Sequence, residues 1–144
     1  FTIMMAGVAL GAFIISRMNT AGREKQLIII TQILTGLAVL STISLSGVGF
    51  VISAFVLHEM FRGAFDPLLG SFLHKRIPSS ERATIDSFCS IAPHIAGSIG
   101  LLASGLIAES FGIEFAWFIS GSILILGAIA VRNGHKNKDP VPDS

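Results

Sequence analysis

Charged residues are scarce in this chain, and cysteine is almost absent. Only 13% of the 144 residues are Asp, Glu, Lys or Arg, against roughly 25% in ordinary soluble domains. Hydrophobic residues make up 51%, and the mean hydropathy is +0.75. The single cysteine, Cys89, cannot form an internal disulfide and has no CxxC partner, which argues against a disulfide framework or a zinc site. The composition indicates a chain whose main solvent is lipid.

Cations are missing from most of the chain. Nine of the ten Lys and Arg residues fall in three short clusters between long apolar segments: Arg17, Arg23 and Lys25; Lys75, Arg76 and Arg82; Arg132, Lys136 and Lys138. The turn regions 41–47 and 109–114 carry none. Because cationic loops stay in the cytoplasm, this alternation predicts a multi-pass protein of the cell (plasma or inner) membrane with a cytoplasmic C-terminus. Cations spread in this way form no basic face for nucleic acid.

Apolar segments predict an all-α, polytopic bundle of about five transmembrane helices. The expected spans are residues 1–16, 27–43, 48–73, 83–108 and 115–131. Because crossing a bilayer takes about 20 residues, the short first span leads us to expect a fragment that begins inside a helix. Residues 78–80, Pro-Ser-Ser, predict a helix stop and a new N-cap, and Pro67 and Pro93 lie inside spans that they could kink. The tail 133–144 is expected to be a disordered cytoplasmic extension.

The fourth span has one face of small and polar residues. At 100° per residue, five positions fall within about 40° of Asp86: Ser90, Pro93, Gly97, Gly100 and Ser104. Small residues let helices approach closely in a bilayer, so this face is expected either to pack on a neighbouring helix or to border a water-filled pathway and slide during gating. His94, roughly 80° from Asp86, lines the same cavity or is a core histidine.

Three charges lie on one face of the third span. Glu59, Arg62 and Asp66 are spaced i, i+3 and i+7, which places them within about 60° on a helix. A charge at this depth is costly unless it is paired, by roughly 2.5 to 3.5 kcal/mol on insertion scales. We expect Arg62 to pair with one carboxylate while the other is protonated, hydrated or paired elsewhere. The group is either a proton-coupling site or a static salt bridge.

Several motifs resemble those of the major facilitator superfamily. Gly11 followed by the loop 17–25 is similar to its cytoplasmic loop motif, with matches at Arg17, Gly22, Arg23 and Lys25 and with Ser16 where the family has Asp. Residues 77–87 resemble the stretch before the eleventh helix, where a Pro, an acid and Arg-Ala-Thr (Arg82 to Thr84) precede a Ser. Arg62-Gly63 resembles the Arg with a nearby Gly of the fourth helix and, less regularly, of its repeat partner, the tenth.

This resemblance covers about residues 7–132 and implies helices eight to twelve of a twelve-helix transporter. It implies two six-helix bundles that rock around a small-molecule site at the midplane, with the lipid bilayer and the missing N-terminal bundle as partners. We expect secondary active transport of a small solute, with protons as the coupling ion and efflux favoured over uptake. The alternative is a non-transporting scaffold or accessory subunit that packs through Gly97, Gly100 and Ser104.

Motifs for other chemistry are missing. The sequence has no Gly-x-Ser-x-Gly elbow, Walker motif or Gly-rich phosphate loop, and no cluster with metal-ligand spacing. These patterns mark hydrolases, nucleotide-driven machines and metal sites. We therefore expect no enzyme activity, no cofactor and no metal.

Overall fold

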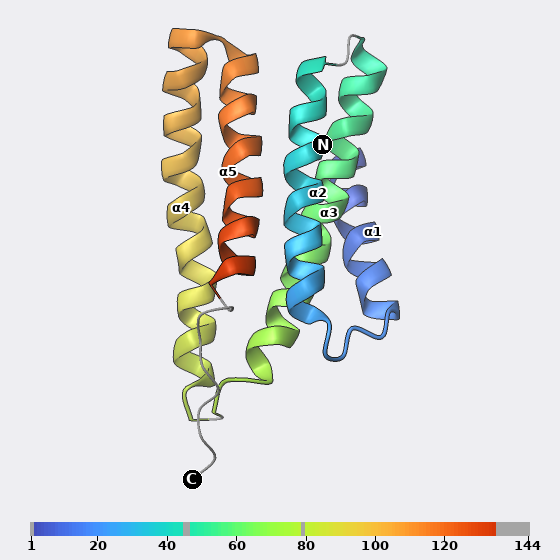
Figure 1. Cartoon of the computed structure of the whole chain (residues 1–144), viewed down its shortest axis with the longest axis vertical. Coiled ribbons are helices and arrows are strands. Elements are labelled where there is room, and N and C mark those ends of the chain that lie inside the picture. Colours follow the sequence, from blue (N-terminus) through green and yellow to red (C-terminus); the bar gives the residue numbers. More distant parts are fainter. Residues whose placement is uncertain (1, 45–46, 79, 135–144) are drawn as a thin grey trace.

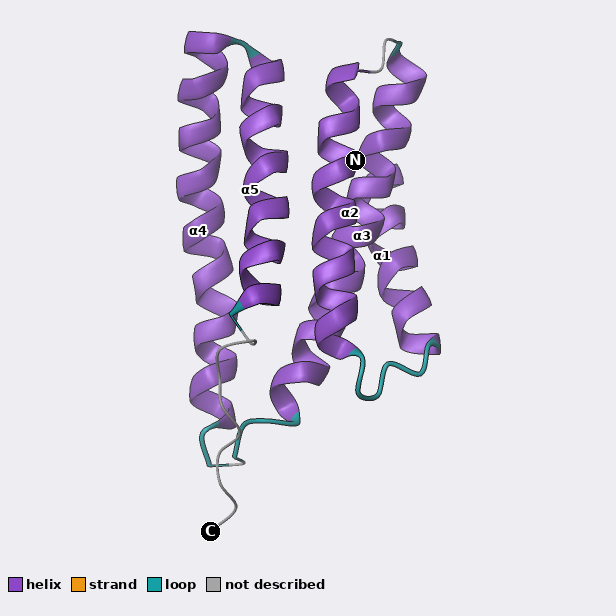
Figure 2. Ribbon diagram, in the orientation of Figure 1, coloured by secondary structure: helices purple, strands orange, loops and turns teal. Residues whose placement is uncertain are grey.

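The computed structural model describes residues 2–44, 47–78 and 80–134. Within these ranges the chain is built from helices and contains no strand (Figure 2). The helices are α1 (Thr2–Arg17), α2 (Glu24–Ser44), α3 (Val48–His74), α4 (Arg82–Phe111) and α5 (Ile113–Asn133). α2 to α5 are long and apolar enough to cross a membrane, whereas α1 is a shorter apolar helix of 16 residues. The predicted all-α, membrane-spanning class is confirmed.

Two predicted helix ends differ from the structure. Residues 78–80 do not supply the N-cap of α4, because Glu81 precedes the helix in an αR conformation and makes no side-chain cap bond. Ser79 itself lies outside the described residues. At the other end, α4 continues to Phe111 and α5 begins at Ile113, so the turn expected over 109–114 shrinks to Gly112. Gly112 has φ +90°, a conformation that glycine adopts without steric cost.

The helices form a three-helix group with a hairpin beside it (Figure 1). α3 contacts both α1 and α2, α2 also contacts α5, and α5 contacts α4. Pro67 and Pro93 both lie inside continuous helices, α3 and α4. α4 contains no buried residue, so most of its surface is open.

The connections that carry Lys and Arg lie at one end of the bundle, and those without them lie at the other. Figure 1 shows the α1–α2 and α3–α4 loops at one end of the bundle, together with the end of α5, and the α2–α3 and α4–α5 connections at the other. The first end carries Arg17, Arg23, Lys75, Arg76 and Arg82. Lys136 and Lys138 of the predicted tail lie outside the described residues. This arrangement is the one that the alternation of cationic loops predicts.

Glycines mark the closest helix contacts. A Cβ on Gly11 would overlap the backbone carbonyl of Met60, and one on Gly63 would overlap that of Val8, so α1 and α3 touch backbone to backbone. A Cβ on Gly36 would lie 2.8 Å from the carbonyl oxygen of Gly121, which makes a second seam between α2 and α5. Without a hydrophobic force between helices in lipid, such close approach is a main source of association.

Candidate functional site

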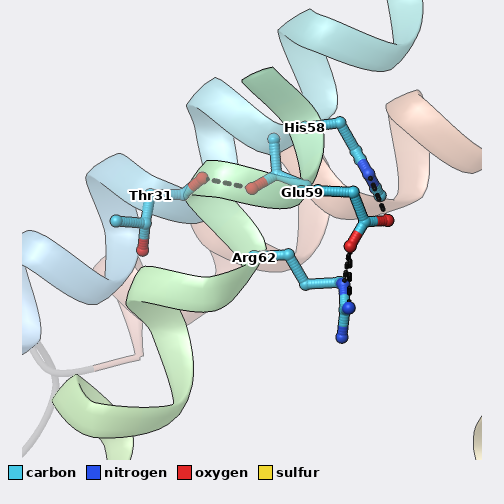
Figure 3. Close-up of polar contacts among 5 residues, drawn as sticks. Thr31, His58, Glu59 and Arg62 are labelled. Carbon is cyan, nitrogen blue, oxygen red and sulfur yellow. Dashed lines mark hydrogen bonds and ion pairs between the residues drawn. The ribbon is translucent and has the colours of Figure 1, made fainter. Parts of the chain in front are cut away.

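A half-buried acid, Glu59, and an exposed arginine, Arg62, form an ion pair halfway along α3 (Figure 3). Arg62 donates from Nε to Glu59 Oε2 over 2.8 Å, and its NH2 lies 2.7 Å from the same oxygen. The Nδ1 of His58 lies 3.3 Å from the other oxygen, Oε1. The Glu59 side chain is 15% exposed and that of Arg62 is 48% exposed. The carboxylate is therefore bound by Arg62 through one oxygen and approached by His58 at the other, while the guanidinium keeps an open flank.

Packing around this cluster fixes its position in the bundle. A Cβ on Gly7 would lie 3.4 Å from the Cβ of Glu59, so α1 passes directly beside the acid. On the other side, the Phe55 ring meets the His58 ring edge-on at 6.4 Å between centroids and the Trp117 ring at 5.8 Å. α1 thus packs beside the turn that carries Glu59, and α5 touches the preceding turn through Trp117. A movement of either helix would change the surroundings of the carboxylate.

Asp66 does not join the pair. No ion pair involves Asp66 within the part of the chain that the structure describes, and its side chain is exposed. It lies seven residues beyond Glu59, roughly 10 Å along the helix, toward the cationic end. The sequence left open which acid would bind Arg62, and the structure selects Glu59.

The small-residue face of α4 is uncovered. Nothing lies within 4 Å of a Cβ placed on Gly97 or Gly100, and Asp86, His94 and Pro93 are exposed while Ser104 is half-buried. The helix–helix contact expected at Gly97 and Gly100 is therefore not formed with any described residue. The half-buried residues of α4, which packs on α5, are Ile85, Cys89, Ala92, Ser104, Ile107 and Ala108.

The loop-motif residues have separate structural roles. Gly11 lies inside α1 against Met60, and Gly22 takes φ +77° in the α1–α2 loop. Arg17 lies with its guanidinium carbon 5.1 Å from the Phe13 ring centroid. Arg23 donates its backbone N–H to Thr20, and Arg82 donates from NH2 to the carbonyl of His74 over 3.4 Å.

A salt bridge between Glu24 and Lys75 was not predicted from the sequence. Glu24 precedes the apolar segment of α2 and is only 2% exposed. It accepts a hydrogen bond from Lys75 Nζ, which joins the start of α2 to the end of α3. This bond lowers the pKa of the Glu24 carboxyl below its ordinary value. The one sequence signal for this salt bridge was an acid, Glu24, among the basic residues of the loop. Its partner could not be identified from the sequence because Lys75 lies 51 residues away.

Among the residues placed by the structure, no group of three His, Cys, Asp or Glu side chains could hold a metal ion. The polar groups of the membrane-spanning helices that could take part in transport are the Glu59–Arg62 pair and the exposed polar residues of α4. Such groups can accept and release a proton or bind a solute.

The whole-chain comparison identifies the family. Residues 1–143 match the sequence model of the Major Facilitator Superfamily. The chain belongs to the major facilitator superfamily. No curated protein and no solved structure gave a significant match. Because this superfamily consists of membrane transporters, the match identifies the chain as a membrane-transporter sequence, and the resemblance seen in its motifs is confirmed.

Proposed function

We propose that this major facilitator chain belongs to a proton-coupled secondary transporter of a small solute. In this proposal, Glu59 is the coupling acid, and Arg62 and the uncovered face of α4 border the solute pathway. The observation that carries the proposal is the Glu59–Arg62 pair in the middle of an apolar helix. Intramembrane charges are expensive and are usually retained for a function.

Protonation of Glu59 would remove the negative charge that holds Arg62. Both contacts of Arg62 with Glu59 end on Oε2, and a hydrogen bond between charged partners is about twice as strong as a neutral one. A proton on this carboxyl therefore releases the guanidinium, whose open flank can then take another partner. Since α1 packs beside this turn and α5 touches the turn before it, the change in charge biases the packing of the bundle toward the other access state.

The proposed arrangement follows the topology of the cationic loops. The five helices correspond to helices eight to twelve of a twelve-helix protein, the cationic end faces the cytoplasm, and a second six-helix bundle completes the site. The open face of α4, with Gly97 and Gly100, supports this arrangement because small residues let a helix of the second bundle approach closely. Efflux is the favoured direction on the family resemblance alone.

The test uses the complete natural protein that contains this segment, reconstituted in vesicles with an internal pH indicator. A panel of sugars, amino acids, organic acids and organic cations is added outside, and solute-dependent proton movement is recorded. Glu59→Gln should abolish proton movement while solute exchange at equal pH continues. Glu109→Gln, an exposed acid near the end of α4, is the matched control and should leave both processes intact. Normal proton coupling in Glu59→Gln would remove the proposed role of this acid.

A further inference from the structure

An apolar cleft opens between α2, α3 and α5 near the cationic end of the bundle. Its volume is about 210 Å³, several times the ~30 Å³ that a water molecule occupies in the liquid. Ile28 and Ile29 of α2, Phe65 and Leu69 of α3, and Ala128 and Val131 of α5 form most of its wall. Because such a wall offers water few hydrogen-bond partners, a cluster of ordered water is a poor occupant.

One cation, Lys25, lines this cleft, and a second, Arg76, lies over the ring of the lining residue Phe72. Lys25, in the first turns of α2, is part of the lining and has no ion pair within the described residues. The Arg76 guanidinium lies 3.9 Å from the ring centroid of Phe72, another lining residue, and donates one hydrogen bond to the Phe72 carbonyl. Arg76 forms no ion pair with an acid among the described residues. The nearby acid, Glu24, is already paired with Lys75.

The cleft has the depth and polarity of a phospholipid. Lys25 lies at the loop end of α2, and Gln32, also in the lining, is seven residues further along, which is roughly 10 Å into the span. A phosphate at the level of Lys25 and Arg76 would therefore place its acyl chain along the apolar wall. Basic pockets at the cytoplasmic ends of transmembrane helices are suited to anionic headgroups.

We propose that this cleft binds an anionic phospholipid of the cytoplasmic leaflet. Lys25 and Arg76 bind the headgroup phosphate, and the acyl chain fills the space between α2, α3 and α5. A bound lipid would contact all three helices at the cationic end, in addition to the direct approach of α2 and α5 at Gly36 and Gly121 deeper in the span. The site is independent of the proposed proton coupling and concerns a different part of the bundle.

The experiment measures lipid retention by the complete natural protein. The purified protein is titrated with phosphatidylglycerol or with phosphatidylcholine of the same acyl chains, and bound lipids are counted by native mass spectrometry. Each cation near the membrane surface strengthens anionic-lipid binding about fivefold, so Lys25→Gln with Arg76→Gln should lower the phosphatidylglycerol preference by roughly 25-fold. Arg17→Gln is the matched control, because Arg17 also lies over a phenylalanine ring, Phe13, at the cationic end but outside the cleft.

A second variant tests the apolar part. Gly127 lines the cleft, and nothing lies within 4 Å of a Cβ placed on it, so Gly127→Leu should fill the space without a backbone clash and reduce retention of both lipids. Gly105→Leu, on open α4, is its control. Excess glycerol 3-phosphate should not displace the lipid.

Three results would overturn the proposal. The first is an unchanged lipid preference in the Lys25 and Arg76 double variant. The second is unchanged retention in a folded Gly127→Leu protein, which would mean that another protein segment fills the cleft or that the lipid binds elsewhere. The third is displacement by glycerol 3-phosphate, which would indicate a site for a soluble anion. If Gly127→Leu fails to fold, the charge variants and the competition still decide the matter.

Discussion

Replacing Gly11 by alanine should weaken the contact between α1 and α3. The new Cβ would overlap the carbonyl oxygen of Met60 and lie 2.8 Å from its carbonyl carbon. Both are backbone atoms, so no side-chain rotation relieves the clash and the two helices must separate. The same reasoning applies to Gly63, whose Cβ would meet the backbone of Val8 at 2.7 Å.

The magnitude follows from two opposing effects. Overpacking costs typically about 1–3 kcal/mol, and a backbone clash belongs at the upper end of that range. Against this, replacing a glycine inside a helix by alanine stabilises the helix by about 0.5–1 kcal/mol, because alanine loses less backbone entropy on folding. Gly11→Ala should therefore lower the free energy of unfolding by about 2 kcal/mol. Gly7→Ala should cost less, because its Cβ would lie 3.0 Å from the Val56 carbonyl oxygen and small adjustments suffice.

The assay is equilibrium unfolding of the purified complete protein in mixed micelles, followed by circular dichroism. Gly105→Ala is the matched control, since nothing lies within 4 Å of its Cβ, and it should be neutral or stabilising by about 0.5–1 kcal/mol. The expected order of stability is Gly105→Ala, then Gly7→Ala, then Gly11→Ala. If Gly11→Ala is as stable as Gly105→Ala, α1 and α3 do not pack in this register.

Four further predictions concern other parts of the bundle. Lys75→Glu should destabilise the bundle by placing two acids together, and the exchange Glu24→Lys with Lys75→Glu should recover part of the loss in the same unfolding assay. Because the pKa of Glu24 is lowered in the folded protein, the stabilisation from this pair is complete above the ordinary glutamate pKa and is lost as the pH falls through the lowered value. Gly36→Ala should loosen α2 from α5, measured by faster protease cleavage. A membrane-impermeant maleimide should label Asn19→Cys only from the cytoplasmic side and Glu114→Cys only from outside; the reverse pattern would invert the topology.

Apolar length and charge were sufficient to predict the helices and that the cationic loops lie at one end of the bundle. Each expected span matches a helix to within a few residues, because an uncharged segment in lipid must satisfy its backbone hydrogen bonds internally. The pair between Glu59 and Arg62 was also accessible from the sequence, since residues three apart on a helix are neighbours. These features depend on local spacing alone.

Long-range contacts were not predictable in the same way. The small-residue patterns at Gly11 and at Gly97 look alike in the sequence, yet only Gly11 has a helix against it in the described structure. Which small face finds a partner depends on how the helices are arranged. Two contacts join segments far apart in the chain: Gly36 with Gly121, and Glu24 with Lys75. No local sequence pattern predicts contacts of this kind.

Water access to α4 is the most direct test of the proposed transport pathway. In the complete protein with Cys89→Ser, the variants Gly97→Cys and Ile99→Cys are treated with a water-soluble, membrane-impermeant maleimide. Gly97 lies on the uncovered small face, and Ile99 lies on the opposite, apolar face. A pathway along α4 predicts that Gly97→Cys reacts from the aqueous side and that Ile99→Cys, exposed to lipid, does not. If neither cysteine reacts with the maleimide in any access state that can be trapped, the proposed pathway along α4 is contradicted.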